Sequence, residues 1–131
     1  MEASHLLRHQ RIKSLIASPT GRVAAASITL WEKMASQIIT IVGEDGFNSL
    51  YARSIFLTQS EFPLLAAGSL APKSDHRFAG LKASLEGQAP AQASEANSLL
   101  LITFTDILAS LIGEQLTTRI LRLAWGHWHF E

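Results

Sequence analysis

Histidines are the side chains of this chain whose spacing could hold a metal ion. The closing stretch "GHWHFE" separates His127 from His129 by one residue, so in an extended chain both imidazoles point to one side. His5 and His9 lie one helical turn apart and form a second possible pair. Two ligands are too few for a protein metal site, and no spacing in the sequence links the two pairs. We therefore expect no bound metal and no other cofactor.

The carboxylates show no spacing typical of acid–base catalysis. Glu32, Glu95 and Asp106 are scattered along the chain, and none has an acidic partner at a diagnostic distance in the sequence. The sequence also lacks a glycine-rich phosphate loop with Lys-Ser or Lys-Thr, a Gly-x-Ser-x-Gly elbow and a His-Glu-x-x-His helix. We therefore predict no catalytic residues and expect that the protein is not an enzyme.

One histidine invites a different reading. In "DHRFAGLKASLEG", His76 stands four residues before Gly80, and the stretch resembles the phosphorylated helix of histidine phosphotransfer bundles, which are all-helical domains of similar size. That pattern places a lysine where this chain has Ala79, and Lys82 is displaced from it. The resemblance implies phosphotransfer through His76, and the competing interpretation is an ordinary solvated histidine.

Composition and charge narrow the class of partner. The 131 residues include eleven Lys and Arg and eleven Asp and Glu, so no net positive field exists to attract nucleic acid. The chain has no cysteine, which excludes disulfides and thiolate zinc sites and is compatible with a reducing compartment. We therefore expect no nucleic-acid partner.

The ends and the apolar runs of the chain predict its location. The first stretch, "MEASHLLRHQRIK", is too rich in charge for a secretory signal, which favours the cytoplasm. The most apolar run, from Leu99 to Ile112, contains Asp106 and is shorter than the roughly 20 residues of a membrane-spanning helix. We expect a buried core helix there and no membrane contact.

Apolar residues recur at three-and-four spacing through most of the chain, and no segment alternates as a strand would. The pattern predicts an all-α bundle of five to six helices in a single domain, residues 1–131. Prolines and glycines around residues 63–75 predict a mobile loop. The predicted helices cover residues 3–17, 22–42, 47–58, 75–88, 90–112 and 115–125.

Two stretches of the chain are similar to each other. Residues 41–55, "IVGEDGFNSLYARSI", match residues 111–125, "LIGEQLTTRILRLAW", once a gap of one residue is allowed. The most informative matches are Gly43 with Gly113, Glu44 with Glu114 and Arg53 with Arg122. Each copy has the form of a long helix, a glycine break and a shorter amphipathic helix, so the repeat predicts two pseudo-repeated helical hairpins that cover each other's apolar faces.

A second interpretation of the repeat is an anion site. The start of each short helix has unpaired amide groups, and Asn48 or Thr117 together with Arg53 or Arg122 could hold an anion there. The glutamate of each Gly-Glu pair argues against it, because a carboxylate in that position repels an anion and itself suits a helix N-terminus.

The repeated stretches, "LWEKMASQIITIVGEDGFNSLYARSIFLTQSEFP" and "LLITFTDILASLIGEQLTTRILRLAW", resemble a family of small uncharacterised bacterial helical proteins from about Leu30 onward. Similar sequences occur in helical regions adjacent to bacterial signalling proteins. The family has no assigned activity. The resemblance therefore implies a bacterial signalling context and supplies no catalytic residues that could be assigned to this chain.

These observations favour a non-catalytic protein-interaction module in bacterial cytoplasmic signalling or regulation, most simply a homodimer with a further protein partner that the sequence does not name. Arginine, tryptophan and tyrosine are enriched at binding hot spots. The candidate partner-binding residues are Arg53, Arg119, Arg122, Trp31 and Tyr51.

Two alternatives remain open at the level of sequence. The first is phosphotransfer through His76. The second is a bundle that encloses a small apolar ligand or a metal in a closed pocket, which the sequence would line with Trp31, Met34, Phe104 and Ile107.

Overall fold

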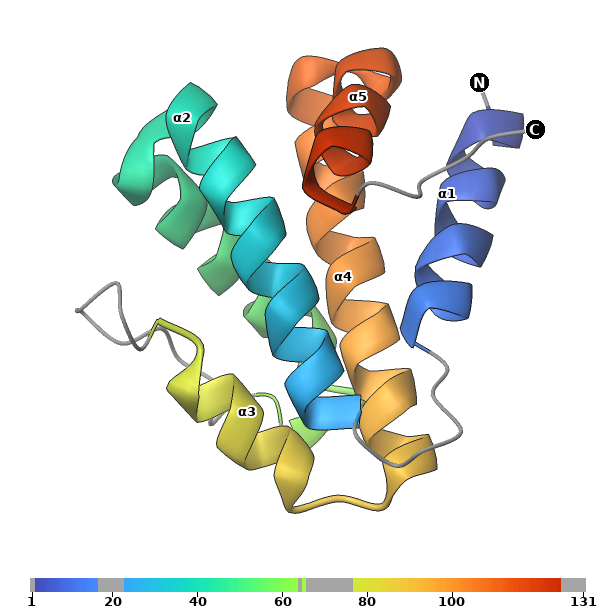
Figure 1. Cartoon of the computed structure of the whole chain (residues 1–131), viewed down its shortest axis with the longest axis vertical. Coiled ribbons are helices and arrows are strands. Elements are labelled where there is room, and N and C mark those ends of the chain that lie inside the picture. Colours follow the sequence, from blue (N-terminus) through green and yellow to red (C-terminus); the bar gives the residue numbers. More distant parts are fainter. Residues whose placement is uncertain (1, 17–22, 64, 66–76, 126–131) are drawn as a thin grey trace.

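The computed structural model describes residues 2–16, 23–63, 65 and 77–125, and it describes the side chains of these residues except at 2–5, 14–16 and 23. The described chain is all-helical, as predicted (Figure 1). Its five helices are α1 (Glu2–Ile16), α2 (Val23–Thr58), α3 (Ala79–Glu86), α4 (Pro90–Ile112) and α5 (Glu114–Trp125).

Glycine breaks the helical path at two places, both of which the sequence predicted. Gly43 lies inside α2 with φ 81° and ψ 167°, and Gly113 separates α4 from α5 with φ 96° and ψ 154°. These backbone angles lie in a region that is open almost only to glycine. No atom lies within 4 Å of the place where a Cβ would stand at either position. Glycine is therefore required at these two positions by the backbone angles and not by close packing.

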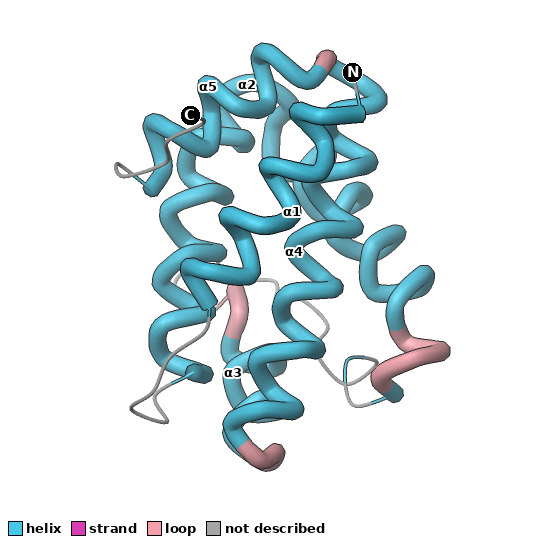
Figure 2. Tube along the Cα trace, turned by 90° about the vertical axis from the view of Figure 1, so that its right-hand side faces the viewer, coloured by secondary structure: helices cyan, strands magenta, loops and turns pink. Residues whose placement is uncertain are grey.

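The helices pack as a central group with one helix on each side. The two parts of α2, before and after Gly43, pack against α4 and α5, and Figures 1 and 2 show α1 lying along α4. α3 packs mainly on α2, on the side of the molecule away from α1 (Figure 1). The indole Nε1 of Trp125 donates to the carbonyl oxygen of Leu30 at 3.0 Å, which ties the end of α5 to α2.

Aromatic rings form the centre of the core. Trp31 makes edge-to-face contacts with Tyr51 at 5.2 Å and with Phe104 at 5.3 Å between ring centroids. Phe47 and Phe78 complete the group, with ring centroids 6.1 Å apart. Burial raises the pKa of the Tyr51 phenol, because the phenolate would lose its hydration. One set of rings thus joins the two parts of α2, α4 and the residue directly before α3.

Two buried polar side chains lie beside this core. The Trp31 indole donates to Oδ1 of Asn97 at 2.8 Å, while Nδ2 of Asn97 and the hydroxyl of Ser27 have no hydrogen-bond partner among the described residues. Buried polar atoms are usually paired, so these two groups lower the stability of the fold.

α4 is longer than the apolar run that the sequence picked out. The run from Leu99 to Ile112, which was predicted to be a buried core helix, is the second half of a 23-residue helix that is long and apolar enough to cross a membrane by length and composition. No other helix in the described ranges meets that test. Its buried side chains face the other helices of the bundle. They are Ala93, Ala96, Asn97, Ser98, Leu100, Leu101, Phe104, Thr105 and Leu108.

One segment differs from the prediction, and a second lies largely outside the described residues. The helix expected at 75–88 occupies only Ala79–Glu86, with residues 75 and 76 outside the described ranges. Most of the loop expected at 63–75 also lies outside them, although Leu65 is described and is buried in the core. Pro90 begins α4 as expected, in a position where a helix needs no amide donor.

Candidate functional site

A fully buried arginine joins α1 to the end of α4 and the start of α5. The Nη1 group of Arg8 donates to Oγ1 of Thr105 at 2.7 Å and to Oδ1 of Asp106 at 2.8 Å. On the other side, Nε and Nη2 donate to the two carboxylate oxygens of Glu114 at 2.8 Å and 3.1 Å. His9 adds a contact of 2.9 Å between its Nε2 and Oδ1 of Asp106. We call these five residues the arginine cluster.

The arginine cluster is electrostatically satisfied although it is buried. The side chain of Arg8 is 0% exposed. Burial alone would lower the pKa of Arg8, but hydrogen bonds and charge attraction from Glu114 and Asp106 outweigh it, so the pKa is raised. A guanidinium in this place is always charged, and its planar fork matches a carboxylate with two parallel bonds. The arrangement of acceptors therefore suits the guanidinium of Arg8 better than it would suit a lysine ammonium.

Sequence reasoning missed this cluster. Arg8 was not among the candidate site residues, because arginine is almost never buried without partners. A signal was present, since Arg8 lies four residues before Ile12 and one helical turn places both on the same face. Its partners are separated from it by about a hundred positions in the chain, and no local pattern points to them.

The glutamates of the two Gly-Glu pairs both bind arginines. Glu114 binds Arg8, and Glu44 accepts a hydrogen bond of 2.7 Å from Nη2 of Arg77. The guanidinium of Arg77 also lies 5.7 Å from the centre of the Phe47 ring, within the range of a cation–π contact. Each helix start predicted as a possible anion site thus already carries its own carboxylate, which is held by an arginine.

The candidate partner-binding residues fall into two groups. Arg53, Arg119 and Arg122 are exposed, on the second part of α2 and on α5. Trp31 and Tyr51, by contrast, are 0% and 1% exposed and pack in the aromatic core. These two aromatic residues cannot reach a partner while the bundle is folded, so their predicted role in binding is corrected to a structural one.

Apolar side chains surround the exposed arginines of α5. Leu116 is 39% exposed and Leu123 is 66% exposed, and both lie at helical spacing with Arg119. We call the face formed by Leu116, Arg119, Arg122 and Leu123 the α5 outer face. α5 separates its buried and exposed faces clearly, with Thr117, Ile120, Leu121, Ala124 and Trp125 pointing inward.

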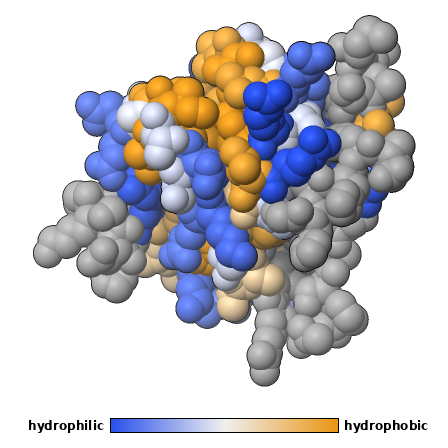
Figure 3. All heavy atoms as spheres, turned by 45° about the horizontal axis from the view of Figure 1, so that its top comes forward, coloured by the Kyte–Doolittle hydropathy of each residue, from blue (hydrophilic) through white to orange (hydrophobic). Residues whose placement is uncertain are grey.

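Further apolar residues are exposed elsewhere on the molecule. Leu111, beside the glycine break between α4 and α5, is 66% exposed, and Ile41 is exposed beside the break in α2. Figure 3, with the top of Figure 1 turned forward, shows hydrophobic atoms gathered next to strongly hydrophilic ones on this end of the bundle. Phe56 and Leu57, close to Arg53, are also exposed.

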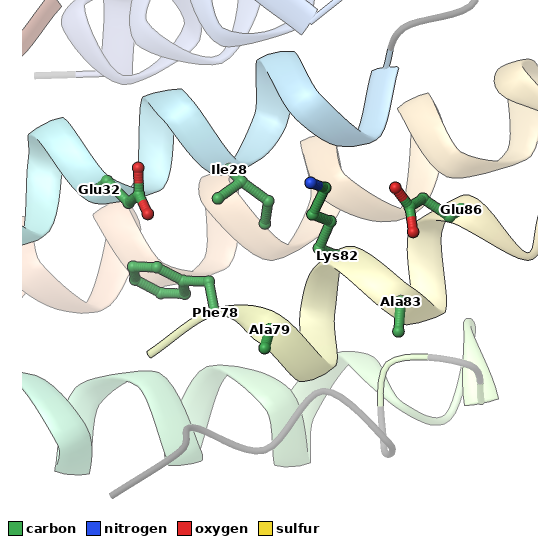
Figure 4. A pocket seen from close by; sticks show the side chains of 7 residues that line it. All are labelled: Ile28, Glu32, Phe78, Ala79, Lys82, Ala83 and Glu86. Carbon is green, nitrogen blue, oxygen red and sulfur yellow. The ribbon is translucent and has the colours of Figure 1, made fainter. Parts of the chain in front are cut away.

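Two grooves run between neighbouring helices. The first, about 360 Å³, lies between α2 and α3, and Figure 4 shows the carboxylates of Glu32 and Glu86 and the ammonium of Lys82 beside the apolar Ile28 and Phe78. We call it the α2–α3 groove. Its charges are mixed and its residues provide no nucleophile or paired base.

The second groove is larger, about 710 Å³, and we call it the α1–α4 groove. It adjoins the arginine cluster, because His9 lines it. The remaining lining residues combine both signs of charge with hydroxyl and apolar groups. They are Lys13, Glu61, Phe62, Ser94, Glu95, Ser98, Leu99 and Ile102.

The structure bears on the alternatives left open by the sequence, namely an enclosed ligand or metal and phosphotransfer through His76, to different extents. The core positions expected to line a ligand cavity are filled, since Trp31, Met34 and Phe104 are fully buried and the two rings lie in contact. His76, His127 and His129 lie outside the described residues. Among the residues that are described, no three His, Cys, Asp or Glu side chains come together as a metal site.

Comparison of the chain with protein-family models, with curated proteins and with solved structures finds no significant match in any of the three. Functional inference therefore rests on the arginine cluster, the α5 outer face and the two grooves.

Proposed function

We propose that this chain is a non-catalytic protein-interaction module of bacterial cytoplasmic signalling or regulation, and that it binds its partner through the α5 outer face. The observation that carries the proposal is the exposure of Leu116 and Leu123 next to Arg119 on a helix whose other face is buried. Large apolar side chains beside arginine are typical of the centre of a protein interface.

The energetic argument concerns the two leucines. Burying a leucine that is exposed in the free protein contributes up to about 1.5–3 kcal/mol to binding. Arg119 and Arg122 favour a partner with carboxylates around an apolar centre, because charge complementarity sets orientation and partner choice. A partner other than a second copy of this chain is therefore expected to present an acidic rim around an apolar patch, whereas a homodimer would be held by the leucines.

We further propose that the bundle is built from two copies of one three-helix unit. In each copy a first helix is followed by a long helix, a glycine break and a short helix. The similarity extends beyond the stretches at the two breaks, because α1 and α3 also match at a nearly constant separation along the chain. The matched residues are Arg8 with Arg77, Ile12 with Leu81 and Lys13 with Lys82.

The ion pairs follow the same relation. Arg8 of the first copy binds Glu114 of the second, and Arg77 of the second copy binds Glu44 of the first. Likewise α1 packs mainly on α4, and α3 mainly on α2. Each first helix is thus exchanged onto the other copy's long helix, as expected for two intertwined units related by a pseudo-twofold axis.

The grooves give independent support for the duplication. Four residues that line the α2–α3 groove have counterparts that line the α1–α4 groove. These pairs are Ile28 and Ser98, Glu32 and Ile102, Phe78 and His9, and Lys82 and Lys13. Equivalent positions form equivalent hollows, although their side chains have diverged.

A second copy of this chain is the first partner to test. Light scattering on the purified protein measures its mass, and a homodimer joined through the α5 outer face is expected to become a monomer when Leu123→Glu places a charge in the interface. Glu86→Gln, in the α2–α3 groove, is the control and should leave the mass unchanged. A dimer that persists in Leu123→Glu contradicts this mode of self-association.

A further inference from the structure

Residues 6–13, the part of α1 whose side chains are described, are held in place by charge more than by apolar burial. Only Arg8 and Ile12 are buried among them. Leu6 is 58% exposed and contributes little to the attachment. This part of α1 is therefore attached through one arginine and one isoleucine.

The matching helix α3 differs in this respect. It buries Leu81 and Leu85, and Phe78 directly before it joins the aromatic core. Its Arg77 pairs with a single exposed carboxylate, that of Glu44. Apolar contacts thus fix α3, whereas the corresponding attachment of α1 is polar.

The surface beneath α1 is specific for an arginine. Thr105, Asp106 and Glu114 present their oxygens to a single guanidinium, and one buried site for Ile12 follows one helical turn later. We call this surface on α4 and α5 the α1 seat. Glu61 and Glu95, which line the adjoining α1–α4 groove, add negative charge along its edge.

Departure of α1 leaves the rest of the packing in place. α1 packs on α4 and only slightly on α2 and α5, while α2, α4 and α5 pack extensively on one another. The seat would then present the neighbouring carboxylates of Asp106 and Glu114, which are 33% and 22% exposed beneath α1, without the cation that separates their charges. A vacant seat therefore favours any helix that returns a guanidinium to it.

We propose that α1 is a releasable cover and that its seat is a docking site for a partner helix carrying an arginine and, four residues later, a large aliphatic residue. Glu114, the α5 residue of the seat, is not part of the α5 outer face, so this proposal does not depend on the function proposed above. In the resting protein α1 occupies the seat as a tethered competitor, at an effective concentration on the order of millimolar.

The test uses the full chain and a labelled peptide with the α1 sequence, EASHLLRHQRIKSLI, followed by fluorescence polarisation. The peptide should bind the wild-type chain weakly, because it must displace the tethered α1. It should bind the Arg8→Met chain at least about tenfold more tightly, because that variant weakens the competitor and leaves the seat intact. An Arg8→Met peptide should bind either chain at least about tenfold more weakly than the natural peptide.

Further variants of the full chain and a hydrogen-exchange measurement make the outcome decisive. Glu114→Gln in the full chain should weaken peptide binding, whereas Leu123→Glu on the α5 outer face should not change it. In wild-type protein the α1 amides should exchange hydrogen faster than those of α4, without global unfolding. Equal protection of α1 and α4, or no saturable binding of the peptide to a folded Arg8→Met chain, overturns the proposal.

Discussion

Arg8 shows how a single residue can hold one helix onto another. Its guanidinium reaches Thr105, Asp106 and Glu114 at once, and these three acceptors come from two different elements. The sequence offered only its spacing from Ile12 as a hint. The pairing could not be predicted, because it depends on where α4 ends and α5 begins relative to α1.

Replacing Arg8 should lower the free energy of unfolding by an amount that depends on how many of its interactions the new side chain keeps. Arg8→Met leaves Asp106 and Glu114 without their cation and should lower the free energy of unfolding by about 3–5 kcal/mol. Arg8→Lys keeps the charge but loses the two-pronged bond to Glu114, so we expect a loss of about 1–3 kcal/mol. Urea unfolding followed by circular dichroism measures both. Lys13→Met, at an exposed position of the same helix, is the control, and equal losses in all three variants would contradict the role of the cluster.

Tyr51 is the only tyrosine of the chain, so its titration can be observed directly. Because burial raises its pKa in the folded protein, the unfolded chain releases the phenolic proton more readily. The stability due to Tyr51 is complete below about pH 10, the ordinary pKa of tyrosine, and is lost as the pH rises from there toward the folded pKa.

Absorbance of the phenolate should therefore show no ionisation near pH 10 until the protein unfolds. Unfolding should occur at a higher pH in Tyr51→Phe, which removes this linkage. A phenol that ionises near pH 10 in the folded protein would show that Tyr51 is not buried as described.

The helices themselves were the part of the fold that the sequence predicted best. Three-and-four spacing located all five, and Pro90, Gly43 and Gly113 marked a start and two breaks. The boundaries of α3 were less accurate, because the residues before it carry no strong capping signal.

The two glycine breaks give a prediction at the scale of elements. Gly43→Ala and Gly113→Ala should each lower the free energy of unfolding by about 1–3 kcal/mol, because a side chain is strained at these backbone angles although it meets no neighbour. Gly87→Ala is the matched control, since Gly87 ends α3 with φ −77° and ordinary contacts. Thermal unfolding of the three variants measures the difference, and a loss confined to one of the two breaks would speak against equivalent corners.

At the scale of the whole molecule, the proposed duplication of one three-helix unit accounts for an arginine-to-glutamate pairing that occurs twice, between α1 and α5 and between the residue before α3 and the break in α2. The repeat was visible in the sequence, but the exchange of first helices was not, because it concerns which copy each helix packs on. The α5 outer face was predicted only through its arginines, and its exposed leucines became evident from the packing.

The central claim is that the α5 outer face binds a protein. The most direct test captures partners from the native host with tagged wild-type chain, Leu123→Glu and the control Glu86→Gln, and quantifies the retained proteins by mass spectrometry. We predict that one specific protein, which can be a second copy of this chain, is retained by wild type and by Glu86→Gln and is lost from Leu123→Glu. Identical sets of retained proteins for all three baits would contradict the claim.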